Sequence, residues 1–220
     1  MKDTTGPADA QARQRDAERT KRELLEVATA VFAEVGYSGA RVDEIAARTR
    51  TTKRMIYYYF GGKEQLYTAV LEAAYRGIRE AERQIDVDGL APAEALRELA
   101  EATYDHHVQH SDFIRLVMIE NIHYAEFLKK LDSIEELGQP AMDVLEGIIA
   151  RGRADGTFRT DVEAFDVHMF ISSYCVFQVA NQHTFGHLFQ RELLAEPAAS
   201  RARTMLGEIA VSWMTGDSAR

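Results

Sequence analysis

The chain has 220 residues, 46% of them hydrophobic and 28% charged, with a formal net charge of −9, and this balance excludes a disordered or collagen-like chain. The single cysteine, Cys175, excludes a disulfide framework and a cysteine-based zinc site and favours a reducing, cytoplasmic setting. No stretch approaches the roughly 18 apolar residues of a membrane span, and the first 23 residues are too polar for a secretory signal. We therefore expect a soluble protein without a membrane partner.

The charge is distributed unevenly along the chain. Residues 1–63 carry 12 Lys or Arg against 9 Asp or Glu, whereas residues 64–220 carry 14 against 26. This asymmetry indicates a basic head that contacts a polyanion, although a local fluctuation of charge would give the same pattern.

Residues 1–17 are polar and lack apolar periodicity, which predicts a disordered arm. Apolar residues at spacings of three and four predict a first helix over about 24–35, and Gly36 stands where that helix would end. A short helix around 42–46, an aromatic-rich helix over 53–60 and a long helix over about 63–83 follow. Two glycines at 61 and 62 break the chain between the last two.

The rest of the chain predicts five further helices, over about 92–108, 113–122, 134–153, 165–181 and 198–213. The helix over 165–181 is apolar on more than one face, so most of its surface must be buried. The sequence shows neither the alternation typical of strands nor an internal repeat. With only 14 glycines and 4 prolines to break helices, it predicts an all-α fold of about nine helices.

Three short helices in about 45 residues, with a tight turn before the last, predict a helix-turn-helix domain over 18–63. Thr52 is placed to cap the third helix, and Lys53 and Arg54 occupy its first turn. Helix N-termini near Thr52 and Lys63 add partial positive charge toward phosphates. Met55 is a candidate for contact with a thymine methyl group, or a simple space filler.

The aromatic run at the end of the third helix cannot be buried as a whole, because four consecutive helical residues point in four directions. We expect Tyr59 and Phe60 to face inward with Ile56, and Tyr57 and Tyr58 to face DNA in part. Their hydroxyl groups can donate to phosphate oxygens.

These residues carry a resemblance. The run GYSGARVDEIAARTRTTKRMIYYYFGGKEQLYTAVL resembles the DNA-binding domain of the TetR family of bacterial one-component transcriptional regulators. Two positions depart from the family pattern: Arg50 stands where the family usually has Gly, and Arg41 where it favours Thr or Ser. A left-handed Arg costs about 1 kcal/mol relative to Gly, so either Arg50 contacts a phosphate or the turn closes differently. Arg41 cannot cap as a hydroxyl does, and we expect it to contact phosphate. The features that match are Gly36-Tyr37, the Asp43, Ile45 and Ala46 core, the run from Ile56 to Phe60, and Lys63-Glu64.

The resemblance implies that residues 64–220 bind a small organic effector and form a homodimer through the last two long helices. It also implies a repressor that binds an inverted repeat in double-stranded operator DNA as a dimer. Binding of the effector would relieve the repression. Apolar walls with a few inward polar groups suit an effector chamber, although the same polar groups can serve helix packing. An aromatic or amphipathic organic acid is one candidate for the effector. The expected effector contacts are Tyr104, His107, Phe113, Met118, Asn121, Tyr174, Phe177, Gln178 and Asn181. The expected dimer contacts are Phe165, Met205, Ile209 and Trp213.

Two other functions compete with this interpretation. The cluster of His106, His110, Glu120 and His123 resembles half of a helical carboxylate–histidine site, which would suit a metal-binding or enzyme-like bundle. A di-iron bundle needs two Glu-x-x-His pairs, and the sequence holds one. A helical interaction module without DNA binding would leave the basic head unexplained. Because no phosphate loop, nucleophile elbow or Cys–His pair is present, we expect no enzymatic activity, cofactor or metal.

Overall fold

The computed structural model describes residues 7–85, 87 and 89–216. Within these ranges the chain is all-helical, with ten α-helices and one short 3-10 helix. The helix beyond the expected nine is α9 (Gln182–Phe189), which follows α8 (Ala164–Ala180) after Asn181 alone. None of the helices in the described ranges is long and apolar enough to cross a bilayer.

The chain divides into two compact units, each described separately below. The first holds the described residues up to Ala73 together with Ile119–Leu131, and the second holds Ala74–Met118 and the described residues from Asp132 onward. Helices α4 (Lys63–Arg83) and α6 (Ser111–Ile122) each contribute to both units.

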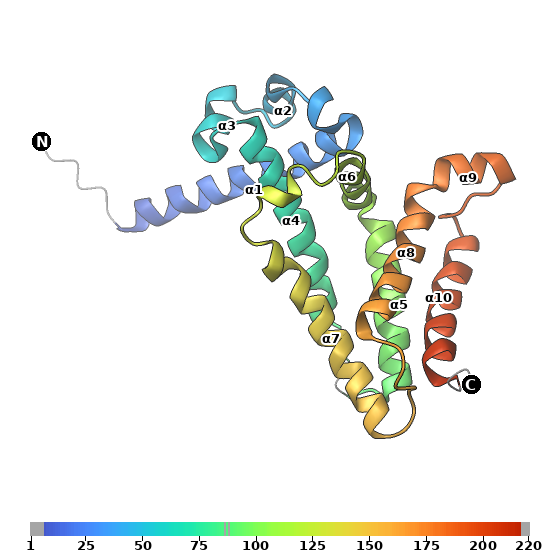
Figure 1. The fold of residues 1–220 in the computed structure, drawn as a ribbon. Helices are drawn as coiled ribbons and strands as arrows, with labels where there is room; N and C mark the ends of the chain where they lie inside the picture. The colour runs from blue at the N-terminus through green and yellow to red at the C-terminus, as the bar shows by residue number, and fades with distance from the viewer. Residues whose placement is uncertain (1–6, 86, 88, 217–220) are drawn as a thin grey trace, which may run out of the picture. The chain divides into compact units, whose positions relative to one another are not determined.

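The first unit is built from α1 (Pro7–Gly39), α2 (Val42–Arg48), α3 (Lys53–Phe60), the first half of α4, the end of α6 and the 3-10 helix Leu128–Lys130 (Figure 1). Its core consists of side chains that are almost completely buried. They come from all of the first four helices, so α4 through Ala73 packs with the head rather than beginning a separate domain at residue 64. The largest of these side chains are Leu24, Phe32, Ile45, Ile56, Leu66 and Tyr67.

The first helix begins earlier than the sequence predicted. The structure is helical from Pro7, within the segment expected to be a disordered arm. Ala, Gln, Arg and Glu dominate this stretch and are strong helix formers, and an ion pair between Arg19 and Asp16 (3.1 Å) supports it one turn apart. At the other end, Gly36 has φ 71° and ψ 174°, which interrupts the helix where the sequence predicted its end.

The second unit contains the remainder of α4 and α6, with α5 (Pro92–Gln109), α7 (Ile134–Ala154), α8, α9 and α10 (Ala198–Thr215). Helix α5 packs against α7, α8 and α10 (Figure 1). Arg203 on α10 bonds to Asp105 on α5 (Nε to Oδ2, 2.8 Å) and also pairs with Glu101. Gly207 permits the close crossing of these two helices, because a Cβ there would lie 2.9 Å from Glu101 Oε1.

Candidate nucleic-acid interface and candidate effector site

The N-terminus of α3 is capped as the sequence predicted. Thr52 has extended backbone angles (φ −110°, ψ 150°), and its hydroxyl accepts a hydrogen bond from the backbone N–H of Met55 at 3.4 Å. Lys53 and Arg54 follow in the first turn with exposed side chains. The capped end therefore presents two cations beside the partial positive charge of a helix N-terminus.

The aromatic end of α3 is divided between core and solvent. Ile56 is completely buried, and Tyr59 and Phe60 are half-buried. Tyr57 is exposed, and the side chain of Tyr58 is 77% exposed. With Arg54, these two tyrosines lie at helical spacings of three and four and form one outward face. The expected division of the run is confirmed, and α3 offers a braced helix with a polar aromatic surface.

The turn between α2 and α3 contains a left-handed arginine. Arg50 has φ 54°. The N–H of Arg50 bonds to the carbonyl of Ala47 (3.4 Å), and the N–H of Thr51 bonds to that of Ala46 (3.1 Å). This is a Schellman motif, in which glycine normally occupies the position that Arg50 holds. The turn thus closes in the usual way at the cost of backbone strain, and the exposed guanidinium remains available for a ligand.

Three cations of the first unit, Arg41, Lys53 and Lys63, differ in their surroundings. Arg41 precedes α2 with extended backbone angles, and its exposed side chain makes no capping bond. Lys53 Nζ lies 3.2 Å from Asp43 Oδ2, but both side chains are largely exposed, so the pair is weak. Lys63 begins α4, and its ammonium lies 4.6 Å from the centre of the Tyr37 ring. Partial burial lowers the pKa of Lys63.

A buried carboxylate holds the segment after α6 against the first unit. Glu120 is 2% exposed and accepts hydrogen bonds from Tyr67 Oη (3.0 Å) and from the backbone N–H groups of Phe127 (3.1 Å) and Leu128 (3.0 Å). Burial and the Glu120 charge raise the pKa of Tyr67. From the sequence, Glu120 was a candidate only as a metal ligand, because Tyr67 lies 53 residues away.

The histidine cluster is not assembled as a metal site. His106 and His110 stack on α5 with ring centres 4.1 Å apart, in the second unit, whereas Glu120 and His123 belong to the first. Across the described ranges, no group of three or more His, Cys, Asp or Glu side chains is arranged to hold a metal ion. Burial, followed by the neighbouring His110, His107 and Arg79, lowers the pKa of His106 to about 4. The metal-binding alternative thus has no assembled ligand group among the described residues.

Some of the expected effector contacts converge inside the second unit. Tyr104 is 2% exposed, and the hydroxyls of Tyr104 and Tyr174 are buried without a hydrogen bond of normal geometry in the described residues. Burial raises the pKa of Tyr104 to about 12. Burial also raises the pKa of Tyr174, and the nearby Gln178 amide opposes this second rise. His107 is also buried, and its Nδ1 lies 2.8 Å from the carbonyl of Thr103.

The other expected contacts differ in their surroundings. Phe113 is buried edge-on against Tyr75 and against His107, with ring centres 5.2 Å and 5.8 Å apart. Met118 and Phe177 are exposed. Asn121 is exposed and belongs to the first unit, whereas Asn181 donates to the carbonyl of Phe177 at the end of α8 (3.2 Å). These residues thus differ in burial and in the unit to which they belong, and a contact with the effector stays a prediction for each of them.

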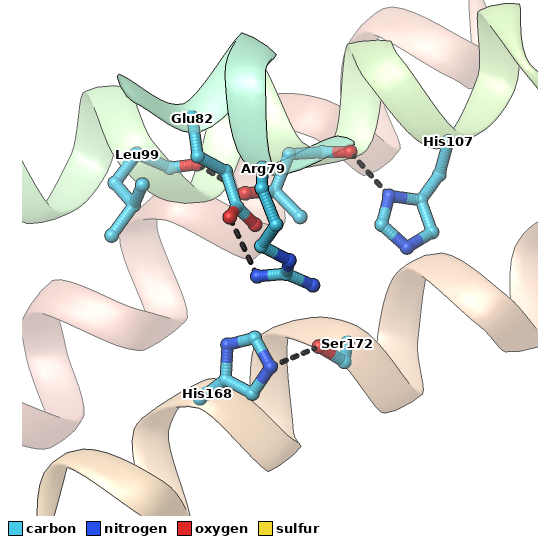
Figure 2. Close-up of polar contacts among 7 residues, drawn as sticks. Arg79, Glu82, Leu99, His107, His168 and Ser172 are labelled. Carbon is cyan, nitrogen blue, oxygen red and sulfur yellow. Dashed lines mark hydrogen bonds and ion pairs between the residues drawn. The ribbon is translucent and has the colours of Figure 1, made fainter. Parts of the chain in front are cut away.

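Sequence reasoning missed a buried polar cluster in the second unit. Arg79 and Glu82 on α4 form a 2.6 Å ion pair, and Figure 2 shows the Arg79 guanidinium directed toward His168 on α8, with His107 of α5 beside it. The signal was present in the sequence: Arg79 and Glu82 continue the helical spacing of Tyr75 and Ile78, which is the buried face of α4.

The exposed faces of α8 and α10 are unusually apolar. Phe165 is 60% exposed and Met169 is exposed on α8, whereas Met205 and Ile209 (41%) are exposed on α10. Such residues at helical spacings on a surface mark an interaction face. Trp213 differs from the other expected dimer contacts, because it is half-buried edge-on against Phe170 (5.7 Å between ring centres).

Two families of known proteins match this chain, one near its N-terminus and one over its C-terminal part. The family described as "Bacterial regulatory proteins, tetR family" matches residues 24–70, and "Tetracyclin repressor-like, C-terminal domain" matches residues 92–209. The chain belongs to the TetR family. It is 34% identical over 199 residues to the HTH-type transcriptional repressor NicS of Pseudomonas putida, covering 90% of this chain and 94% of NicS.

Solved structures of the TetR fold match most of the chain. A tetR-family regulatory protein from Rhodococcus RHA1 matches with a TM-score of 0.70 and 19% identity, over 90% of this chain and 98% of that chain. The transcriptional regulator FadR from Bacillus subtilis, solved in complex with stearoyl-CoA, matches with a TM-score of 0.67 and 18% identity, over 88% and 98%. This TetR-family chain is thus a DNA-binding transcriptional regulator with a helix-turn-helix head and a helical C-terminal domain.

Proposed function

We propose that this protein is a repressor that binds an inverted-repeat operator as a homodimer and leaves it when a small organic effector binds. The observation that carries the proposal is α3: its capped N-terminus and outward face expose Lys53, Arg54, Tyr57 and Tyr58 on a helix braced by the buried Ile56. A short, braced helix of this kind fits the major groove. NicS, the relative named above, is a repressor, which supports repression here.

Around α3, the proposed contacts divide into two kinds. Arg54, Met55 and Tyr58 would reach base edges, because they lie on or beside the outward face of the helix. Arg41, Arg50, Thr52, Lys53, Tyr57 and Lys63 would bind phosphates and set the orientation of the head. Phosphate contacts by Arg and Lys make the affinity depend on salt, so an acidic protein can still bind DNA through a basic head.

Helices α8 and α10 would form the dimer interface. Two helices from each subunit form a four-helix contact, which suits a pair related by twofold symmetry. The exposed Phe165, Met169, Met205 and Ile209 would become buried in that contact. A twofold dimer places its two recognition helices on two half-sites of opposite orientation, which is why an inverted repeat is proposed.

The effector would bind inside the second unit near Tyr104, His107, Tyr174 and Gln178. Buried hydroxyls without a good partner are the polar groups that a ligand satisfies. FadR, which shares the fold, was solved with stearoyl-CoA bound, which supports a small-molecule site in this kind of protein. We further infer that the protein acts in the cytoplasm and that it is not an enzyme, as is typical of its family.

The salt dependence of DNA binding tests the proposed head. Fluorescence anisotropy with labelled duplex should show affinity falling with salt, and Lys63→Ala should reduce the slope of log K against log[salt] by about 0.9. The loss should be similar for all sequences, since a phosphate contact carries no base information. Arg201→Ala, an exposed arginine of α10, serves as the control and should leave the slope unchanged. An unchanged slope in Lys63→Ala would remove Lys63 from the interface.

A further inference from the structure

The ion pair on the buried face of α4 does not join two helices. Arg79 and Glu82 are three residues apart on α4, and their side chains are only 11% and 7% exposed. Other partly buried arginines of the second unit connect separate segments: Arg203 joins α10 to α5, and Arg151 of α7 donates to the carbonyls of Val87 and Leu90. Removing a pair of charges from water is unfavourable. Because, among the described residues, the hydrogen bonds and ion pairs of Arg79 and Glu82 do not link α4 to another helix, a bond between helices does not explain the burial of this pair.

The Arg79 guanidinium has N–H donors that do not bond to Glu82. Its Nη1 bonds to Glu82 Oε2 at 2.6 Å, whereas Nε is inaccessible to solvent and has no hydrogen-bond partner within the described ranges. In Figure 2 the guanidinium lies on the side of α4 that faces His168, with His107 next to it. A guanidinium keeps its charge at any physiological pH and offers five N–H groups in a fixed fork. A second acceptor can therefore bind it.

Apart from Glu82, the side chains that face the guanidinium are two histidines. Burial raises the pKa of Glu82, and the Arg79 charge and hydrogen bond oppose that rise. Burial and the Arg79 charge lower the pKa of His107 to about 4 and also lower that of His168, so both imidazoles are neutral. His107 uses Nδ1 at the Thr103 carbonyl (2.8 Å), and the His168 ring meets Ser172 Oγ only at 3.5 Å. Three helices thus bring one permanent cation and two neutral imidazoles close to one another.

We propose that Arg79, His107 and His168 form the head-group site for the carboxylate of a small organic acid. The inference rests on the proposed function, because that acid would be the effector. A planar carboxylate matches the guanidinium fork and accepts two parallel N–H bonds, and an imidazole donates a further bond. Glu82 is the internal competitor for the same guanidinium. Leu99 and Ile171 are buried on the helices that carry the two histidines.

Matched acids and amides provide the test. Purified full-length protein is titrated with benzoate, hexanoate, benzamide, hexanamide and inorganic phosphate to about 10 mM, with thermal unfolding and the arginine Nε–H signals in proton–nitrogen NMR as readouts. At least one of the two carboxylates should raise the melting temperature and shift one buried Nε–H signal, and its amide should do neither. Stabilisation by the amides as strong as by the acids, by phosphate alone, or by none of the five probes overturns the proposal.

Three variants connect the response to the site. Arg79→Gln should weaken carboxylate binding at least tenfold, which is the loss of one charge-assisted hydrogen bond or more. Glu82→Gln removes the competitor, so the acid should stabilise this variant more than it stabilises the wild type. Arg76→Gln, an exposed arginine on the same helix, is the control and should respond as the wild type does. A wild-type response in Arg79→Gln, or an equal loss in Glu82→Gln, contradicts the proposed site.

Measuring DNA binding in the same titrations separates the two proposals. If the acid binds at Arg79 but duplex affinity does not change, the anion site is supported and effector control of DNA binding fails. If a neutral compound releases DNA from wild type and Arg79→Gln alike, effector control is supported and the anion site fails.

Discussion

The phenol of Tyr67 on α4 donates a 3.0 Å hydrogen bond to the carboxylate of Glu120, 53 residues away near the end of α6. Both groups are buried in the first unit, and two backbone N–H groups complete the coordination of the carboxylate. A buried carboxylate with three donors is stable only while those donors remain in place. This contact therefore fixes the segment between α6 and the 3-10 helix on the DNA-binding head.

Replacing Glu120 should destabilise the protein more than replacing Tyr67. Glu120→Gln puts an amide N–H among three donors and should lower the free energy of unfolding by about 2 kcal/mol, whereas Tyr67→Phe removes one donor and should lower it by about 1 kcal/mol. Urea titrations followed by circular dichroism measure both. If Glu120→Gln proved no less stable than Tyr67→Phe, the carboxylate would not be what holds this segment.

Arg50→Gly should separate fold stability from DNA affinity. Glycine adopts the left-handed angles of the turn without strain, so the variant should be more stable by about 1 kcal/mol. It should also bind duplex DNA more weakly, because the guanidinium is gone. Arg50→Ala is the matched control, since it loses the charge and keeps the strain. Wild-type DNA affinity in both variants would leave Arg50 without a phosphate contact.

Ile209→Asp should disrupt the homodimer. It places a charge in the exposed apolar face of α10 while leaving the buried core untouched, whereas a change at Trp213 would also disturb the contact with Phe170. Sedimentation equilibrium should show a monomer at micromolar concentrations at which the wild type is a dimer, and DNA affinity should fall with it. Ala150→Asp, at an exposed position of α7, should stay dimeric. A dimeric Ile209→Asp would place the interface elsewhere.

His107 should make the protein less stable as the pH falls. Burial lowers its pKa to about 4, and the nearby Arg79, His168 and His110 act in the same direction against the hydrogen bond to Thr103. Since the unfolded chain takes up a proton near pH 6.5 and the folded protein does not, stability declines from about pH 6.5 toward 4, with about 2 kcal/mol lost between pH 7 and 5. His107→Gln should reduce this loss in urea titrations across that range. An unchanged pH dependence would contradict a neutral, buried His107.

The parts of the fold that the sequence predicts are those set by neighbouring residues. The Thr52 cap, the interruption at Gly36 and the break at Gly61 (φ 87°) each depend on one residue and the few after it. The pattern of neighbouring residues did not predict two other helical segments. The first helix extends back to Pro7 because helix propensity sufficed without an apolar face, and α9 occupies residues 182–189, where no helix was predicted.

The parts that could not be predicted are contacts between distant residues. Arg79 and His168 come from different helices, and nothing in the spacing of either indicates the other. Tyr67 and Glu120 are separated in the same way, so Glu120 suggested a metal ligand until its three donors were seen. Burial along α8 could not be predicted from residue type either, because the hydroxyl of Tyr174 is buried whereas Phe177, three residues later, is exposed.

Selection of bound duplexes from a fully randomised DNA pool tests the central claim most directly. For a dimeric regulator we expect one enriched motif made of two inverted half-sites. The centres of the half-sites should be separated by one helical turn of about 10 base pairs or a multiple of it. Arg54→Ala should weaken binding to the selected sequence about tenfold or more and relax its specificity. A pool that enriches no motif, or a single half-site without its inverted partner, would contradict a dimeric regulator that reads DNA through α3.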